Sequence, residues 1–267
     1  MSIPSAAARI LGSECRLELV RCGDVDYYRD TSHILMVATT DEGLRRLRSE
    51  AEGRAWAITV GVSVPEVLAV DQEHGWLISR WIKAHEPEGP EYVRSGLAGA
   101  DAISKGALVR PATASTWRAS RRDLAVRVMR MASAGVNLQD FRARRAAAMS
   151  LPNSSMAHGD YYVGNVLRGA EQVFVVDWEF WGPAPKYTDH LRFWSTLRRR
   201  EDRELAMDLI SSAAGSQRRS LATLAIWLAY RLLAQNASAP PRQRNMGDLE
   251  HARRVVREAE DRFADLL

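Results

Sequence analysis

Hydrophobic and polar positions alternate with a two-residue period in parts of the first third of the chain, a pattern typical of β-strands. The strands predicted there are residues 16–20, 33–38, 64–70 and 76–82. Residues 21–30 contain Gly23 and three aspartates and predict a turn between the first two strands. A second turn is expected at His74 and Gly75.

Between the second and third predicted strands, the apolar residues follow a helical period. Leu44, Leu47, Ala51 and Ala55 share one face of a helix predicted over residues 41–58. Asp41 is the expected N-cap of this helix. Two strands, a helix and two more strands predict a small antiparallel sheet with one helix packed on it.

The rest of the chain has a different pattern. Glycine and proline interrupt residues 83–120 repeatedly, and we expect the connection between two lobes at the start of this segment. Residues 121–148 predict a helix, and residues 173–177 predict a short apolar strand that ends in a carboxylate. From Asp189 onward the pattern is helical, and Pro240-Pro241 separates the last two helices. A sheet-rich lobe, 1–82, and a helical lobe, 83–267, are therefore predicted, with the chemistry in the cleft between them.

Composition and charge exclude several classes of protein. Hydrophobic residues make up 46% of the chain and charged residues 26%, which is typical of a folded protein and not of a disordered one. The net charge of +4 comes from arginine, since only three lysines are present, and the arginine clusters lie in helical patterns typical of solvated faces. Cys15 and Cys22 have no metal-site spacing. With neither a signal peptide nor a membrane span evident, we expect a cytoplasmic protein without nucleic-acid or membrane partners.

Candidate chemistry concentrates between His158 and Glu179. Residues 158–167 read His-Gly-Asp-Tyr-Tyr-Val-Gly-Asn-Val-Leu, and residues 173–179 read Val-Phe-Val-Val-Asp-Trp-Glu. Phosphoryl transfer needs a carboxylate that accepts the proton of an attacking hydroxyl and oxygen ligands that hold Mg²⁺ at the nucleotide phosphates. Asp160 is the predicted base, and Asn165 and Asp177 are the predicted metal ligands.

This segment resembles the aminoglycoside phosphotransferase and choline kinase family, distant relatives of protein kinases. The family's His-x-Asp-x-x-x-x-Asn loop is matched by His158, Asp160 and Asn165, and its metal-binding Asp by Asp177. The resemblance implies Mg²⁺, ATP or GTP as phosphoryl donor, and structural support of the loop by His158 and by Asp189. It also implies an α+β, two-lobed, protein-kinase-like fold with a small antiparallel-sheet N-terminal lobe and a larger helical C-terminal lobe.

The same resemblance extends to the first lobe. Glu50 matches a helix Glu of the family, with the ordinary exposed helix Glu as the competing interpretation. The strand that ends at Arg80, Trp81 and Ile82 resembles the family's hinge, whose backbone groups meet the adenine or guanine edge.

The match fails at one position. The family places a lysine on the third strand, but residues 32–39 read Ser-His-Ile-Leu-Met-Val-Ala-Thr, and no lysine occurs in the first 82 residues. Three explanations stay open. An arginine such as Arg29 takes the lysine's place, the metal ions suffice, or the protein binds nucleotide weakly.

The resemblance therefore implies a small-molecule kinase whose acceptor is a hydroxyl of an antibiotic, a nucleoside or a sugar. The expected acceptor region is rich in arginine, which favours a neutral or weakly charged acceptor over a polycationic aminoglycoside. The alternative is a nucleotide-binding pseudokinase or binding module with impaired turnover. A protein kinase is disfavoured because Asp189 follows Asp177 too closely to leave room for a long activation segment.

Overall fold

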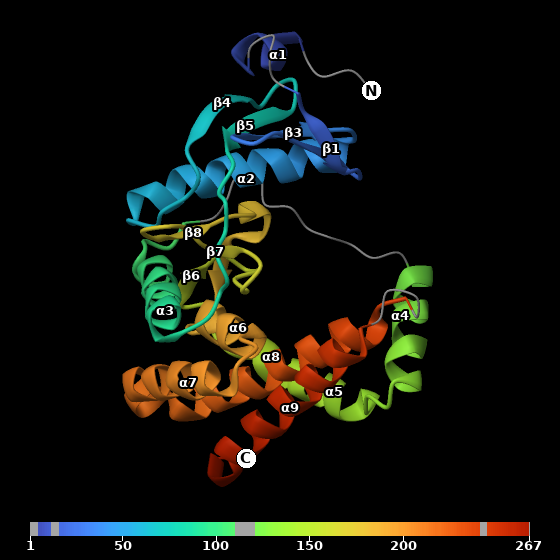
Figure 1. Ribbon diagram of the computed structural model, residues 1–267. Helices are drawn as coiled ribbons and strands as arrows, with labels where there is room; N and C mark the ends of the chain where they lie inside the picture. Colours follow the sequence, from blue (N-terminus) through green and yellow to red (C-terminus); the bar gives the residue numbers. More distant parts are fainter. Residues whose placement is uncertain (1–4, 12–15, 110–120, 241–244, 267) are drawn as a thin grey trace. The chain divides into compact units, whose positions relative to one another are not determined.

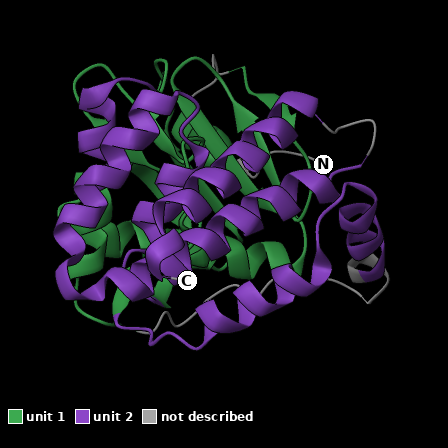
Figure 2. Ribbon diagram, turned by 90° about the horizontal axis from the view of Figure 1, so that it is seen from below, with its two compact units in different colours: residues 1–87, 98–116, 155–183 green, residues 88–97, 117–154, 184–267 purple. Residues whose placement is uncertain are grey.

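The computed structural model describes residues 5–11, 16–109, 121–240 and 245–266. Cys15, Pro241 and the end of the segment 83–120 lie outside the described residues. The chain divides into two compact units, shown in different colours in Figure 2. Unit 1 comprises Met1–Pro87, Ala98–Thr116 and Ser155–Pro183, and unit 2 comprises Glu88–Leu97, Trp117–Ser154 and Ala184–Leu267.

A five-stranded antiparallel sheet is the main element of unit 1 (Figure 1), and its strand order is β1-β2-β3-β5-β4. The strands are β1 (Glu18–Arg21), β2 (Val25–Arg29), β3 (His33–Ala38), β4 (Val67–Asp71) and β5 (Trp76–Arg80). Apolar side chains alternate between the two faces of the sheet. Leu35 and Ile78 pack on one face with Ala7 of helix α1 (Ser5–Leu11). Met36 and Leu77 pack on the other.

The second face of the sheet is covered by helix α2 (Asp41–Thr59), which runs along the sheet in Figure 1. Leu47 of α2 is fully buried against Met36 and Leu77. The side chain of Thr40 accepts a hydrogen bond from the Gly43 N–H, 3.0 Å away, so the N-cap is one residue before the one predicted.

Short elements between Ser155 and Ala184 complete unit 1. They are β6 (Ser155–Ala157), β7 (Val166–Arg168), β8 (Val173–Val175), the 3-10 turn η1 (Trp178–Phe180) and β9 (Gly182–Ala184), whose last residue begins unit 2. β7 and β8 form an antiparallel hairpin, and β6 pairs with β9. The α2 residue Trp56 stacks on Trp181 with ring centroids 5.2 Å apart, which ties these elements to α2.

Unit 2 is helical. Its helices are α4 (Arg121–Ser133), α5 (Leu138–Met149), α6 (Thr188–Thr196), α7 (Arg200–Ala214), α8 (Arg218–Ser238) and α9 (Met246–Arg262), with the short turns η2 (Gly215–Gln217) and η3 (Ala264–Leu266). α8 packs against α4, α5, α6, α7 and α9, which explains why it is apolar on most sides. The rings of Phe141 and Trp227 lie 5.2 Å apart at the α5–α8 contact. In the described part of the chain, no helix has the length and apolar character needed to cross a bilayer.

Helix α3 (Pro90–Lys105) runs through a segment predicted to be broken by glycines, and that prediction is wrong. A Cβ on Gly96 would lie 2.4 Å from the ring of Phe193, and a Cβ on Gly99 would lie 2.5 Å from the Tyr161 hydroxyl. These glycines therefore permit close packing of aromatic residues and do not end the helix.

Two further predictions are wrong for local reasons. Residues 21–30 contain β2 as well as a turn, because Val25 packs in the core beside Leu47 and the strand pairs with both β1 and β3. The single helix over 121–148 is two helices, since Gly135 has a φ of 79° and Asn137 caps α5. The α+β fold with an antiparallel sheet and a largely helical remainder is confirmed. The lobe boundary after Ile82 stays a prediction.

Candidate active site

The loop from His158 to Asn165 follows β6 and is held by its histidine. His158 is fully buried, and burial lowers the pKa of its ring to about 4, so the ring is neutral at pH 7. A carbonyl can only accept, so Nε2 carries the hydrogen and donates to Val176 O at 3.0 Å. Nδ1 then accepts from the Asp160 N–H at 3.3 Å. The ring therefore links Asp160 to the residue before Asp177.

Asp160 and Asn165 are joined within this loop. The Asn165 side-chain amide donates to the Asp160 carbonyl oxygen at 3.0 Å, which leaves the side-chain oxygen of Asn165 for another partner. The Asn165 carbonyl oxygen accepts from the Val176 N–H at 3.0 Å. Gly159 has a φ of 84°, and a Cβ there would lie 2.3 Å from Phe180 O, so only glycine fits.

Asp177 follows Val176, the last residue of these hydrogen bonds, and lies two residues after β8. It is one of two non-glycine residues with a positive φ in the described part of the chain, at 68°. Burial, as the largest cause, raises the pKa of its carboxyl, and with the negative charges of Glu50, Glu179 and Asp160, in that order, brings it to about 7. Arg21 opposes this shift. The site thus collects more negative charge than its own residues neutralise.

This donor set fits a magnesium ion. Mg²⁺ prefers oxygen ligands, usually one or two carboxylates plus water and phosphate oxygens. Asp177 offers a carboxylate and Asn165 an amide oxygen, and a cation there would relieve the charge that raises the pKa of Asp177. Among the described residues, no three His, Cys, Asp or Glu side chains form a metal site by themselves. The fit therefore depends on Asn165 and on ligand phosphates.

A pocket of about 180 Å³ in unit 1 adjoins these residues. It is lined by polar and apolar side chains from the sheet, α2 and the 165–177 segment, namely Arg21, Tyr27, Ile34, Met36, Glu50, Arg54, Pro65, Ser79, Arg80, Trp81, Ile82, Asn165, Leu167, Val176 and Asp177. Six predicted site residues are thus brought together, since the two predicted metal ligands line the pocket with Glu50 and the three predicted hinge residues.

The predicted hinge contains backbone groups without a hydrogen-bond partner among the described residues, and both groups of Ile82 are among them. The Arg80 N–H donates to Glu66 O at 2.9 Å, and the Trp81 N–H donates to Ser32 O at 2.8 Å. Within the described residues, Ile82 forms no such backbone hydrogen bond, so its N–H and carbonyl are free for a planar base.

Glu50 and Arg54 face the pocket from α2. Glu50 is 1% exposed, and one of its carboxylate oxygens accepts from the Trp178 N–H. The other accepts from Arg54 Nε at 2.5 Å. Arg54 is a pocket residue that sequence reasoning missed, although its place four residues after Glu50 puts both on one helix face. Arg29, considered as a substitute for the missing lysine, lies elsewhere, with its guanidinium 5.0 Å from the Trp81 ring centroid and beside another pocket.

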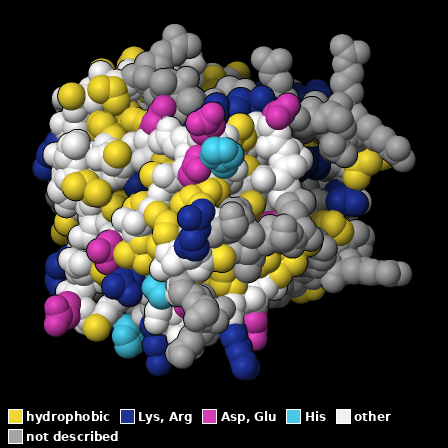
Figure 3. All heavy atoms as spheres, turned by 90° about the horizontal axis from the view of Figure 1, so that it is seen from above, with side chains coloured by type: hydrophobic (Ala, Val, Ile, Leu, Met, Phe, Trp, Pro, Cys, Tyr) yellow, Lys and Arg dark blue, Asp and Glu magenta, His cyan; other side chains and the backbone are white. Residues whose placement is uncertain are grey.

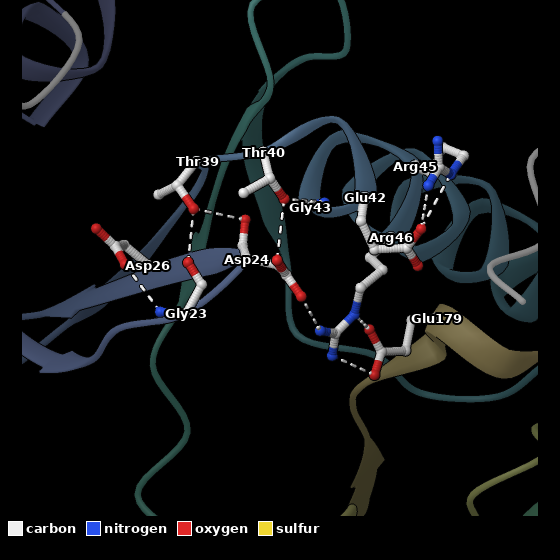
Figure 4. A network of polar contacts seen from close by, with 10 residues as sticks. All are labelled: Gly23, Asp24, Asp26, Thr39, Thr40, Glu42, Gly43, Arg45, Arg46 and Glu179. Carbon is white, nitrogen blue, oxygen red and sulfur yellow. Dashed lines mark hydrogen bonds and ion pairs between the residues drawn. The ribbon is translucent and has the colours of Figure 1, made fainter. Parts of the chain in front are cut away.

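A second polar network, drawn in Figure 4, joins α2 to the segment after Asp177. Arg46 donates from two nitrogens to the carboxylate of Glu179 and lies 3.7 Å from Asp24. Asp24 in turn accepts from the Thr40 hydroxyl at 3.0 Å. Glu179 thus binds the Arg46 side chain, and it anchors the turn that begins with Trp178.

Asp189 lies in unit 2, in the first turn of α6, and is 3% exposed. Its burial agrees with a structural residue. Its predicted support of the catalytic loop stays a prediction.

Fold and site together define a kinase-like α+β protein with a pocket beside a cluster of acidic and amide groups. The chain belongs to the phosphotransferase enzyme family, whose family model matches residues 24–227. Membership of this family supports a small-molecule phosphotransferase. Comparison with curated protein sequences found no match.

Several solved structures share the fold. A choline/ethanolamine kinase family protein from Mesorhizobium loti has a TM-score of 0.58 at 17% identity, with 98% of each chain covered. A thermostable mutant of aminoglycoside phosphotransferase APH(4)-Ia, in a ternary complex with ADP and hygromycin B, has a TM-score of 0.58 at 16% identity, covering 96% of this chain and 98% of that one. The macrolide 2'-phosphotransferase MphH from Brachybacterium faecium has a TM-score of 0.50 at 16% identity, with 90% of each chain covered. At such identities the likeness shows the fold alone.

Proposed function

We propose that the protein transfers the γ-phosphoryl group of ATP or GTP to a hydroxyl group of a small molecule, with Mg²⁺ as cofactor and Asp160 as base. One observation carries this proposal. Hydrogen bonds connect Asp160 to Asn165 and Asn165 to Val176, so the predicted base, one predicted metal ligand and the residue before the other, Asp177, belong to one bonded assembly. Structural neighbours crystallised with ADP, ATP or GDP support a nucleotide donor.

Each residue of the assembly has a distinct task. Asp160 orients the attacking hydroxyl and accepts its proton. Asn165 and Asp177 hold Mg²⁺, which would neutralise charge on the phosphates. His158 remains neutral and fixes the loop that carries Asp160. The free backbone groups of Ile82 offer a donor and an acceptor to the edge of the adenine or guanine base.

The acceptor is proposed to be neutral or weakly charged, such as an uncharged antibiotic, a nucleoside or a sugar. Several acids of unit 2 that could attract a cation already have partners within that unit. Glu201 pairs with Arg199, and Glu204 pairs with Arg200 at 2.7 Å. Asp202 is 2% exposed and accepts from the Gly89 N–H at 3.1 Å. A polycationic acceptor would find little unpaired negative charge at these positions.

The test is a transfer assay with γ-labelled ATP and GTP on a panel of hydroxylated antibiotics, nucleosides and sugars, with Mg²⁺ or with a chelator. Removing a general base costs about 10²–10⁴-fold in rate. Asp160→Asn should therefore lose transfer by that factor and still bind nucleotide. Equal rates of phosphoryl transfer by wild type and Asp160→Asn would show that Asp160 is not the base.

One observation favours a second candidate, a nucleotide-binding pseudokinase or binding module. The pocket lining from β3 consists of Ile34 and Met36, and neither brings a cation to the phosphates. Thermal unfolding with ATP and with GTP, each with and without Mg²⁺, separates the two candidates. A kinase should be stabilised more when Mg²⁺ is present. If a nucleotide stabilises the protein equally with and without Mg²⁺, the second candidate is favoured.

A further inference from the structure

The charged residues of the pocket differ in burial. Three arginines line it, Arg21, Arg54 and Arg80. Arg21 is exposed on the edge strand β1, and Arg80 is exposed and paired with Glu66 at 3.1 Å. Arg54 is only 4% exposed. It is therefore the one pocket cation, among the described residues, that is held within the protein and not in solvent.

The hydrogen bonding of Arg54 is incomplete. Only its Nε is bonded, to Glu50, and its Nη1 is buried with no partner in the described part of the chain. A buried donor without a partner costs free energy comparable to a lost hydrogen bond, so native proteins rarely keep one without a reason.

Two other arginines show what a structural ion pair looks like in this protein. Arg203, 3% exposed, donates from Nε and Nη2 to Glu258 and from Nη1 to the carbonyl oxygens of Leu197 and Arg198. Arg46 donates from two nitrogens to Glu179. In both residues, two guanidinium nitrogens donate to the same carboxylate. Arg54, which lines the pocket, instead leaves Nη1 without a partner among the described residues.

We infer that Arg54 is a phosphate-binding residue of the nucleotide site and supplies from α2 the positive charge that β3 lacks. This inference rests on the proposed function. The guanidinium end donates to phosphate oxygens, a pairing that its planar fork favours. Glu50 is the positioning residue. One of its oxygens fixes Arg54, and the other accepts from the N–H of Trp178, the residue after Asp177. The cation and the predicted metal ligand are thus positioned by the same carboxylate.

The experiment compares affinities for ATP, ADP and adenosine in the presence of Mg²⁺, by calorimetry, in the full chain. The guanine series replaces them if GTP binds more tightly. Arg54→Met should weaken ATP and ADP binding at least about tenfold, and adenosine affinity should stay within about twofold. Arg54→Lys keeps the charge without the fork and should fall between wild type and Arg54→Met. Arg45→Met removes an equal charge from an exposed position on the same helix and should change none of the three affinities.

A structural role for Arg54 predicts a different pattern, in which ATP, ADP and adenosine lose affinity by the same factor. That pattern, or unchanged ATP affinity in Arg54→Met, overturns the inference and leaves the proposed function intact. If Arg54→Met does not fold, Arg54→Lys provides the test. A larger loss of affinity for ATP than for adenosine supports the inference, and equal losses overturn it. Wild-type protein that binds no nucleotide at all overturns both the inference and the proposed function.

Discussion

At the scale of single residues, Asp177 carries the clearest electrostatic signal. Its left-handed backbone, with φ at 68°, is uncommon for any residue but glycine, although Asp tolerates it better than most. Its carboxyl is buried, and Glu50 is the nearby charge that raises its pKa most. Residues with a strained backbone or a shifted pKa are concentrated at functional sites. The arrangement that binds a ligand there differs from the arrangement that would make the fold most stable.

The raised pKa has a consequence for stability without metal. Between the ordinary value near 4 and the folded value of about 7, the folded protein holds a proton on Asp177 that the unfolded chain has lost. The free energy of unfolding should therefore fall as pH rises through this window, by at most about 1.4 kcal/mol per pH unit from this group. Asp177→Asn removes the group and with it this loss of stability. From pH 4 to pH 7, the free energy of unfolding of the variant should therefore increase relative to that of wild type.

Chemical unfolding at several pH values in chelator measures this difference. Glu73→Gln, which changes an exposed carboxylate on a turn, is the matched control and should leave the pH dependence as in wild type. A wild-type to Asp177→Asn difference that stays constant from pH 4 to pH 7 would contradict the raised pKa.

At the scale of elements, α2 connects the sheet to the site. Its residues 46, 50 and 54 recur every four positions, so their side chains lie along one face. Arg46 binds Glu179, and Glu50 binds the N–H of Trp178. Gly53 lies between these contacts, and Trp56 packs on Trp178 and Trp181. The helix thereby fixes the turn that follows Asp177.

Gly53 tests this packing. A Cβ at this position would lie 2.6 Å from Trp178 Cβ and 2.9 Å from a Trp181 ring carbon. Helix propensity alone would make Gly53→Ala stabilising by about 1 kcal/mol. Overpacking should reverse the sign and destabilise the protein by about 1–3 kcal/mol, measured by denaturant unfolding.

The exposed neighbour Ala55 provides the control, since Ala55→Ser should cost less than about 1 kcal/mol. A more stable Gly53→Ala protein would show that α2 does not approach the turn as closely as described.

The same elements explain what the sequence could predict. The loop with Asp160 and Asn165 and the strand before Asp177 were predictable because their chemistry is ordered within about twenty residues of chain. β2 was missed because its aspartates look like turn residues, although Asp26 is 7% exposed and accepts from the Gly23 N–H at 3.1 Å. The Arg46–Glu179 pair was missed because its residues are more than a hundred positions apart. Arg54 was missed because the pocket that it lines also takes residues from the distant 165–177 segment.

At the scale of the whole molecule, surface charge adds little to the picture. On the face in Figure 3, basic, acidic and hydrophobic side chains are interspersed. This face is an ordinary solvated surface without a patch of one sign. The proposed function therefore depends on one cluster of residues that would bind one cation and one nucleotide.

A crystal structure of the protein with a non-hydrolysable ATP analogue and Mg²⁺ tests this claim most directly. We expect Mg²⁺ to be held by side-chain oxygens of both Asn165 and Asp177 together with phosphate oxygens of the analogue. The Asp160 carboxylate should lie beside the γ-phosphate, with room between them for a hydroxyl. A nucleotide bound elsewhere, or a metal held without Asn165 and Asp177, would contradict the account.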